Sequence, residues 1–241
     1  MKRITIIAVT LLSIISCRKD EYSTSQIVIG HYPMDVNYID HTIIGEYNSA
    51  SNYYLDIDKD GRNDYMFSSV LSGSPSAGIH PISTISCLHD QAELFGEVKQ
   101  NTLYLNIDTI SYSTDNNNLV RVNINHNYTC TQLNQTDSIL KTSTVNKIIP
   151  MVKHDILKVD HLFFNDTLVI ANDEWTLYNN SHTVGDTTYT THNKFFNNCN
   201  DFPQNINTYI GIRLNGTELG WIELAIHDKY KINIIETAII K

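Results

Sequence analysis

Cysteine, proline and basic residues are all scarce in this chain of 241 residues. The four cysteines form no C-x-x-C pair, so their spacing gives no zinc-ligand pattern. With five prolines and ten glycines, no Pro, Gly or Ser-rich linker divides the chain. Only 17 Lys and Arg stand against 26 Asp and Glu, and no basic stripe occurs. A phosphate-binding surface for nucleic acid is therefore not expected.

The chain also lacks an apolar run long enough to cross a membrane. Its first segment begins with Lys2 and Arg3, continues as an apolar stretch over Ile4–Ile15, and ends at Ser16 and Cys17. The stretch is shorter than the roughly 20 residues that a spanning helix needs. Residues 1–16 are therefore expected to be a cleaved secretion signal.

The end of this signal, Ile14-Ile15-Ser16-Cys17, resembles a bacterial lipobox. The resemblance implies cleavage before Cys17 and acylation of that cysteine, which would tether the mature chain to a membrane surface. The alternative is an ordinary signal peptide in which Cys17 is incidental. Cleavage removes two basic residues and no acid, which moves the formal charge from −9 to −11.

Residues 17–26 form a polar segment that is too poor in apolar side chains to join a core, and we expect a flexible tether. Within it, Lys19-Asp20-Glu21 resembles the short tag that exports Bacteroidota lipoproteins to the outer face of the outer membrane. The resemblance implies a surface-exposed outer-membrane lipoprotein. A solvated linker on a protein that faces the periplasm is the alternative.

Three cysteines remain after Cys17, namely Cys87, Cys130 and Cys199. An odd number permits one disulfide and leaves one thiol over. The pairing among the three stays open.

Residues 27–241 show short apolar or alternating runs between polar turns, rich in Ile, Val, Tyr, Thr and Phe. No segment after the signal has the three-to-four spacing of a confident helix. About a dozen such runs predict a single all-β, β-sandwich-like domain. The runs cover residues 26–30, 53–57, 64–71, 102–110, 119–125, 127–133, 161–170, 208–214, 220–226 and 231–240.

The most specific local pattern is a hairpin near the C-terminus. Asn215-Gly216 tolerates the positive φ angles of a type I′ turn, so residues 209–214 and 219–226 are expected to pair antiparallel. Trp221 is expected in the core rather than on a ligand platform.

The sequence YYLDIDKDGRNDYMF, residues 53–67, concentrates acids at one bend between two strand-like runs. The pattern D-x-D-x-D-G-x-x-D matches the first nine positions of a calcium loop, in which carboxylates and one backbone carbonyl bind the ion. Carboxylates this close repel one another unless a cation compensates them. The expected ligands are Asp56, Asp58, Asp60, the backbone of Arg62, and Asp64.

The loop departs from an EF-hand, because Phe67 stands where the bidentate glutamate belongs and the flanks predict strands. Calcium is favoured over magnesium because it tolerates irregular geometry. We expect a structural calcium site that takes a further ligand from elsewhere in the chain. The alternative is a solvated acidic turn that needs no ion.

Together the loop and the C-terminal hairpin resemble a group of uncharacterised secreted and lipidated Bacteroidota proteins. The shared features are the aspartate loop, a Y-x-G-x-R strand and a G-W-I strand, and they cover about a tenth of this chain. The resemblance implies location and fold and carries no activity. The matching residues are Asp56 to Asp64, Tyr209, Gly211, Arg213, Gly220, Trp221 and Ile222.

No catalytic motif stands out. His80, His89, His154, His182 and His192 are scattered, and neither H-E-x-x-H nor G-x-S-x-G occurs. The pairs Asp173-Glu174 and Glu93 with Glu97 are interpreted as charged turn or surface residues rather than as a glycosidase pair. Trp175 and Tyr178 could stack on a sugar.

The chemistry therefore favours a non-enzymatic surface module that binds a glycan or a protein. A glycan hydrolase and a purely structural or adhesive protein are the alternatives. A binding module should present a flat face with exposed aromatics and few acids, whereas a hydrolase should bring two carboxylates, or a histidine and an acid, together in a deep pocket.

Overall fold

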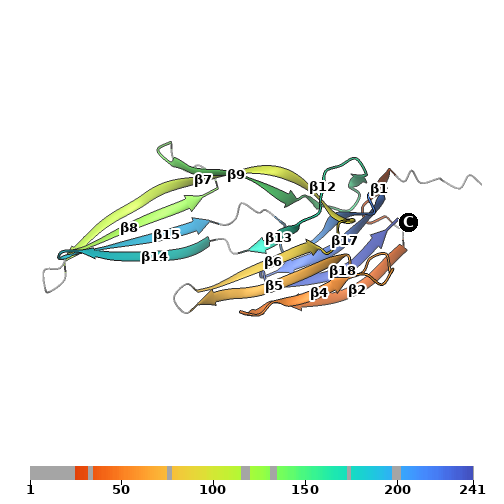
Figure 1. The fold of residues 1–241 in the computed structure, drawn as a ribbon, viewed down its shortest axis with the longest axis horizontal. Helices are drawn as coiled ribbons and strands as arrows, with labels where there is room; N and C mark the ends of the chain where they lie inside the picture. The colour runs from red at the N-terminus through yellow and green to blue at the C-terminus, as the bar shows by residue number, and fades with distance from the viewer. Residues whose placement is uncertain are drawn as a thin grey trace, which may run out of the picture.

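The chain is all-β, as the sequence predicts, with eighteen strands and no helix among the described residues. This computed structural model describes residues 25–31, 35–74, 78–114, 120–130, 135–172, 175–196 and 202–240. The predicted signal at 1–16, Cys17 and most of the tether lie outside these ranges. The strands form a β-sandwich-like body from which a longer, thinner sheet extends (Figure 1).

Two sheets make the body. One contains β16, β17, β18 and β2 in that order, and the other has the order β13-β6-β5-β3 with β4 beside β5. A small β1-β11 pair completes it. The strands of the body are β1 (Gln26–Val28), β2 (Asp35–Ile44), β3 (Glu46–Tyr47), β4 (Ser51–Leu55), β5 (Tyr65–Ser74), β6 (Gly78–Cys87), β10 (Pro150–Met151), β11 (Ile156–Lys158), β12 (Phe163–Phe164), β13 (Thr167–Asn172), β16 (Asn207–Leu214), β17 (Glu218–His227) and β18 (Lys231–Ile239).

The rest of the chain forms an arm on one side of the body (Figure 1). Its strands are β7 (Ala92–Thr114), β8 (Val120–Thr129), β9 (Ser138–Ile148), β14 (Trp175–Val184) and β15 (Thr187–Phe196). We call the four strands in the order β14-β15-β8-β7 the distal sheet. Its central pair, β15 and β8, is parallel, whereas β14-β15 and β7-β8 are antiparallel.

Strand β7 joins the arm to the body. Its first residues pair with β16 and β12, its middle pairs with β9, and its last part, from Tyr104 to Thr114, pairs with β8. Such a 23-residue strand is far longer than the usual five or six residues. The direction of the arm is therefore fixed by an unbroken backbone that starts inside the sandwich.

Alternation along the C-terminal strands places two apolar cores on opposite faces of one sheet. Ile210, Ile222 and Leu224 lie in the core between the two large sheets. Trp221 is fully buried on the other face with Leu157 and other residues around β1 and β11. The expectation that Trp221 belongs to the core is confirmed.

The predicted hairpin is also confirmed, since Asn215 and Gly216 both have positive φ angles and the amide of Thr217 donates to the carbonyl of Leu214. The connection is one residue longer than a two-residue turn, because Leu214 pairs with Glu218.

Several strands were not expected from the sequence. The hydrophobic pattern gave no strand for residues 35–44, 78–87, 138–148, 175–184 or 187–196, all of which are strands. Most of these segments are rich in Thr, Ser and Asn, and many of their side chains remain exposed or half-buried. Conversely, we expected a strand over residues 127–133, but β8 ends at Thr129.

Gly96 lies where β7 leaves the body, and its substitution tests how closely the backbone packs there. A Cβ at this position would collide with the backbone carbonyl oxygen of Lys147 and lie 3.0 Å from the ring of Phe164. Since a backbone atom cannot move aside cheaply, we expect Gly96→Ala to lower the free energy of unfolding by about 1–3 kcal/mol. Urea denaturation measures this. Thr114→Ala, at the exposed end of the same strand, is the control and should change stability by less than about 0.5 kcal/mol.

Candidate functional site

The acidic loop spans the turn between β4 and β5. The amide of Asp64 donates to the carbonyl of Leu55 at 2.8 Å and so closes the loop. Lys59 and Gly61 have φ angles of 60° and 92°, which bend the backbone back on itself. The strands on either side are those that the sequence predicts, so a β-hairpin rather than a helix pair holds the acids.

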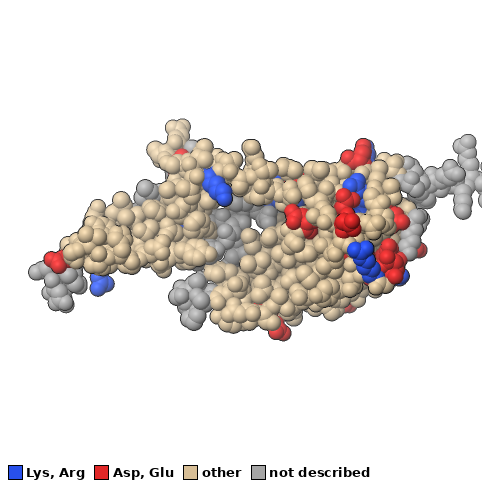
Figure 2. Space-filling view, in the orientation of Figure 1, with Lys and Arg blue, Asp and Glu red and all other residues tan. Residues whose placement is uncertain are grey.

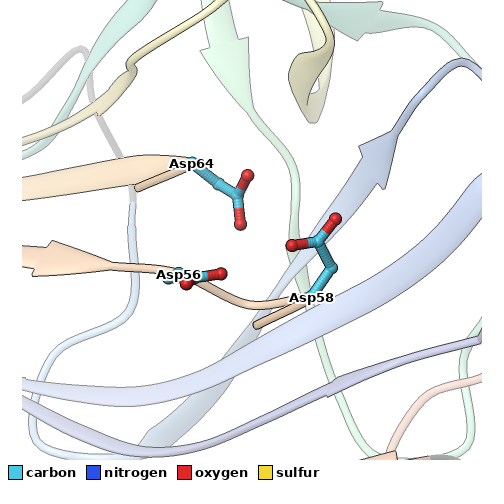
Figure 3. A group of neighbouring side chains, drawn as sticks. All are labelled: Asp56, Asp58 and Asp64. Carbon is cyan, nitrogen blue, oxygen red and sulfur yellow. The ribbon is translucent and has the colours of Figure 1, made fainter. Parts of the chain in front are cut away.

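Three of the predicted ligands converge. One carboxylate oxygen from each of Asp56, Asp58 and Asp64 lies within 4.8 Å of the other two. Figure 3 shows that the three side chains point toward a common centre. Asp60 is outside this group, because its side chain is exposed and one of its oxygens accepts a hydrogen bond from the Arg62 amide at 2.7 Å. Arg62 was expected to contribute its backbone carbonyl, which the convergence of carboxylates does not test. A role for these two in ion binding stays a prediction.

Asp64 is the buried member of the group, with 2% of its surface exposed. Its Oδ2 accepts a hydrogen bond from the Ile57 amide at 2.7 Å, and its Oδ1 lies 2.9 Å from Nε2 of His89. The amide of Leu88 donates to the Asp64 carbonyl. The loop is thereby attached to the connection that precedes β7. No short sequence pattern indicates the contact between His89 and Asp64, since the two residues lie 25 positions apart.

The electrostatics of the loop are unfavourable without a counter-ion. Oδ1 of Asp56 is buried and accepts no hydrogen bond from the described residues, although Oδ2 of the same group accepts one from the Gly61 amide. Burial, and then the negative charges of Asp64, Asp60 and Asp56, raises the pKa of the Asp58 carboxyl. Hard carboxylate oxygens at such spacing suit a divalent cation of the calcium class.

Of the acids considered for hydrolysis, Glu93 is held in an ion pair. Both oxygens of Glu93 accept hydrogen bonds from Arg213, at 2.6 and 3.0 Å, and the guanidinium also packs over the ring of Phe163. The ion pair between Arg213 and Glu93 helps to hold β7 against β16. Asp173 and Glu174 lie outside the described residues.

Glu97 lines a different feature, a cleft of about 240 Å³ at the base of the arm. Its other lining residues are Lys99, Lys147, Ile148, Ile149, Pro150, Val169 and Phe202. The volume falls below the roughly 300 Å³ at which small-molecule pockets usually begin. We assign this cleft no role.

A second carboxyl pair lies inside the body. Glu223 and Glu236 stand opposite each other on β17 and β18 and are only 8% and 3% exposed. Burial raises the pKa of Glu223, and a hydrogen bond with Glu236 adds to the effect, whereas the bond from Asn207 opposes it. The sequence did not reveal this pair.

One face of the distal sheet is rich in aromatic residues and bears no charged residue among its described side chains. Register places Phe195 beside Tyr128, Tyr178 beside Asn193, and His182, Tyr189, Val122 and Tyr112 in one row across the four strands. On the face of the molecule that Figure 2 draws, most of the charged side chains lie on the body and few lie on the arm. We define the aromatic face as the side of the distal sheet that bears Tyr112, Val122, Ile124, His126, Tyr128, Tyr178, His182, Tyr189, Asn193 and Phe195.

Part of the aromatic face is ordered by contacts among its own side chains. The rings of Tyr128 and Phe195 stack at 4.1 Å, and Tyr178 meets Phe195 edge-on at 5.8 Å. Asn193 is 8% exposed, and its Oδ1 lies 3.2 Å from the Tyr128 hydroxyl and 3.3 Å from Nδ1 of His126. These contacts hold the rings of Tyr128 and Phe195 in place.

Two rings of the aromatic face are open to solvent. Tyr112 is 73% exposed and Tyr178 is 55% exposed, although neighbouring Val122 is buried. The opposite side of the sheet carries mainly Asn, Ser and Thr, with Arg121 and Lys194 as its described charged side chains. Only one side of the distal sheet therefore offers a broad apolar surface.

The cysteines differ in state. Cys130 is disulfide-bonded, whereas Cys87 is a free thiol. Burial raises the pKa of the Cys87 thiol to about 11, so it stays protonated and unreactive at neutral pH. This agrees with the expectation of one bridge and one thiol left over. Cys199 lies outside the described residues.

Comparison with known proteins finds no matching family model, no matching curated protein and no matching solved structure. None of the described residues forms a helix that is both long and apolar enough to cross a membrane.

The charge of Asp58 gives the loop a distinctive pH dependence. Because its pKa is raised in the folded chain, the metal-free protein loses stability as pH rises through that value and keeps it below the ordinary aspartate range. We therefore expect Asp58→Asn to raise slightly the melting temperature at pH 7 in chelator, and to have no such effect near pH 3. Thermal unfolding at both pH values measures this. A loss of stability at pH 7 would contradict the repulsion among these carboxylates.

Proposed function

We propose that this chain is a calcium-stabilised binding module, held on a membrane surface by a lipid on Cys17, whose aromatic face binds a glycan. The observation that carries the proposal is the uncharged aromatic face on an arm that projects from the body. It has at least two exposed tyrosines and no acid among its described side chains. Those are the features expected of a binding module rather than of a hydrolase.

The chemistry of the aromatic face suits sugars. Tyrosine offers a rigid apolar ring and a polar hydroxyl, and pyranose rings present C–H groups that pack on such a ring. Amide side chains such as Asn180, which lies on the same face, can hydrogen-bond to sugar hydroxyls. Tyr and Asn also dominate protein-binding loops, so a surface protein is the alternative ligand. The absence of charge favours a neutral glycan over a charged partner.

The loop supports the calcium part of the proposal. Three converging carboxylates, one of them 2% exposed, and a buried oxygen without a protein donor leave a cation as the simplest source of compensation. Calcium bound only by the folded state would stabilise it by mass action. Extracellular calcium sites typically have dissociation constants of about 10⁻⁴–10⁻³ M. Such a site would fill only after export.

Two features support a place outside the cytoplasm. The disulfide at Cys130 is typical of oxidising compartments. The signal-like segment ending at Cys17 supplies the lipid attachment point, and the tag-like Lys19-Asp20-Glu21 supports the outer face of the outer membrane.

A glycan array followed by titration of the strongest hit tests the glycan proposal. We expect Tyr112→Ala to weaken binding about tenfold, because a stacking contact of about 1.4 kcal/mol is lost. Tyr38→Ala is a matched control, since Tyr38 on β2 of the body is 74% exposed and Tyr112 is 73% exposed. The control should bind as the unmodified chain does. If no glycan binds, or if both variants bind normally, the aromatic face is not a sugar site.

Thermal unfolding with and without calcium tests the metal proposal separately. Millimolar calcium should raise the melting temperature of the unmodified chain, and chelator should reverse the rise. Asp56→Ala should remove the response because it deletes one of the three converging carboxylates. Asp90→Ala removes an exposed acid beside His89 and should leave the response intact. A calcium response that survives in Asp56→Ala would place the ion elsewhere.

A further inference from the structure

We propose that β14 is a self-association edge: two copies of this chain pair antiparallel through β14 and join their distal sheets into one continuous sheet. The inference goes beyond ligand binding, and it depends on backbone geometry rather than on the aromatic rings or the calcium loop.

β14 lies at the end of the strand order and pairs with β15 alone among the described strands. All side chains from Tyr178 to Val184 are exposed. At ten residues the strand is nearly twice the usual length. A long, exposed edge presents a row of backbone N–H and C=O groups to which a further strand can add.

The other long edges carry features that discourage strand addition. β2 contains Asp35 and Asp40 and has a register shift against β18, and the outer part of β7 has one between Ile107 and Thr109. β9, which pairs with β7 alone, contains two lysines. Charges and bulges of this kind are how natural sheets block edge-to-edge pairing. β14 has no charged residue and no proline, and its register with β15 is unbroken.

Hairpin geometry identifies the outward-facing backbone groups. Val184 pairs with Thr187 across a two-residue turn in which Gly185 has a positive φ, so their backbones bond to each other. Hydrogen bonding alternates along an antiparallel pair. The backbones of Leu177, Asn179, Ser181 and Thr183 therefore point away from β15.

The outward-facing backbone groups of β14 can pair with the same groups of a second copy. A two-fold axis perpendicular to the sheet at Asn180 brings Asn179 opposite Ser181 of the second copy and Leu177 opposite Thr183 of the second copy. The outward groups can then form about eight backbone hydrogen bonds. Tyr178 faces His182 of the second copy, a ring pairing that this sheet already makes between His182 and Tyr189 at 5.1 Å. No like charges meet.

The pairing has two structural consequences. A perpendicular axis keeps both aromatic faces on the same side, so the dimer presents one surface of double width. Because β14 runs along the arm, antiparallel pairing places the two bodies at opposite ends (Figure 1). One pair of strands buries less than the roughly 1,200 Å² of a stable interface, so the dimer should be weak and concentration-dependent.

Sedimentation equilibrium of the unlipidated mature chain, residues 18–241, tests the proposal. We expect a reversible monomer–dimer equilibrium with a dissociation constant in the micromolar range, roughly as for small interfaces. Asn180→Lys should raise that constant at least about tenfold, because two like charges meet at the axis. Ser111→Lys places the same charge on the opposite edge of the distal sheet and should leave it unchanged. Equal melting temperatures establish that both variants fold.

A monomer at every concentration up to about 0.5 mM would overturn the proposal, which requires weak association to be detectable in that range. The proposal would also be overturned if Ser111→Lys weakened dimerisation and Asn180→Lys did not.

The register of the two β14 strands has its own test, since directly opposed residues of an antiparallel pair are close enough for a disulfide. Asn180→Cys should give a covalent dimer on mild oxidation that reductant reverses. Dimers without this cross-link would rule out the axis at Asn180.

Discussion

The carboxylate of Asp64 is the constraint on which this account depends. It is buried, it accepts a hydrogen bond from the Ile57 amide, and it contacts His89 in the connection that leads into β7. The same group brings negative charge against Asp56 and Asp58. Burying a carboxylate is costly unless it is compensated, so the bend that shapes the sandwich also creates a demand for positive charge. We propose that calcium supplies the part of this compensation that the Ile57 amide and His89 do not.

The body and the arm differ in how much apolar surface they bury. Apolar burial is concentrated in the two cores around Ile222 and Trp221, which stabilise the sandwich and the root of β7. Few of the described side chains of the distal sheet are buried, so its aromatic face does not pack against a second layer of strands. The body thus projects a sheet on whose aromatic face no described side chain is charged.

The sequence predicted the local features well and the distant ones poorly. The aspartate pattern and Asn215-Gly216 are specified by neighbouring residues, so the loop, its flanking strands and the C-terminal hairpin could be recognised. The arm was harder, because β14 and β15 consist largely of Thr, Asn and Ser and lack a clear apolar alternation. The contact of His89 with Asp64 and the pairing of Glu223 with Glu236 depend on tertiary structure, which no short pattern encodes.

The most direct test of the central claim is a crystal structure grown in millimolar calcium, with anomalous scattering recorded at long wavelength. The account predicts one anomalous peak within about 2.3–2.6 Å of oxygens from Asp56, Asp58 and Asp64. A structure in which no peak occurs there and the three carboxylates turn apart into solvent would contradict it.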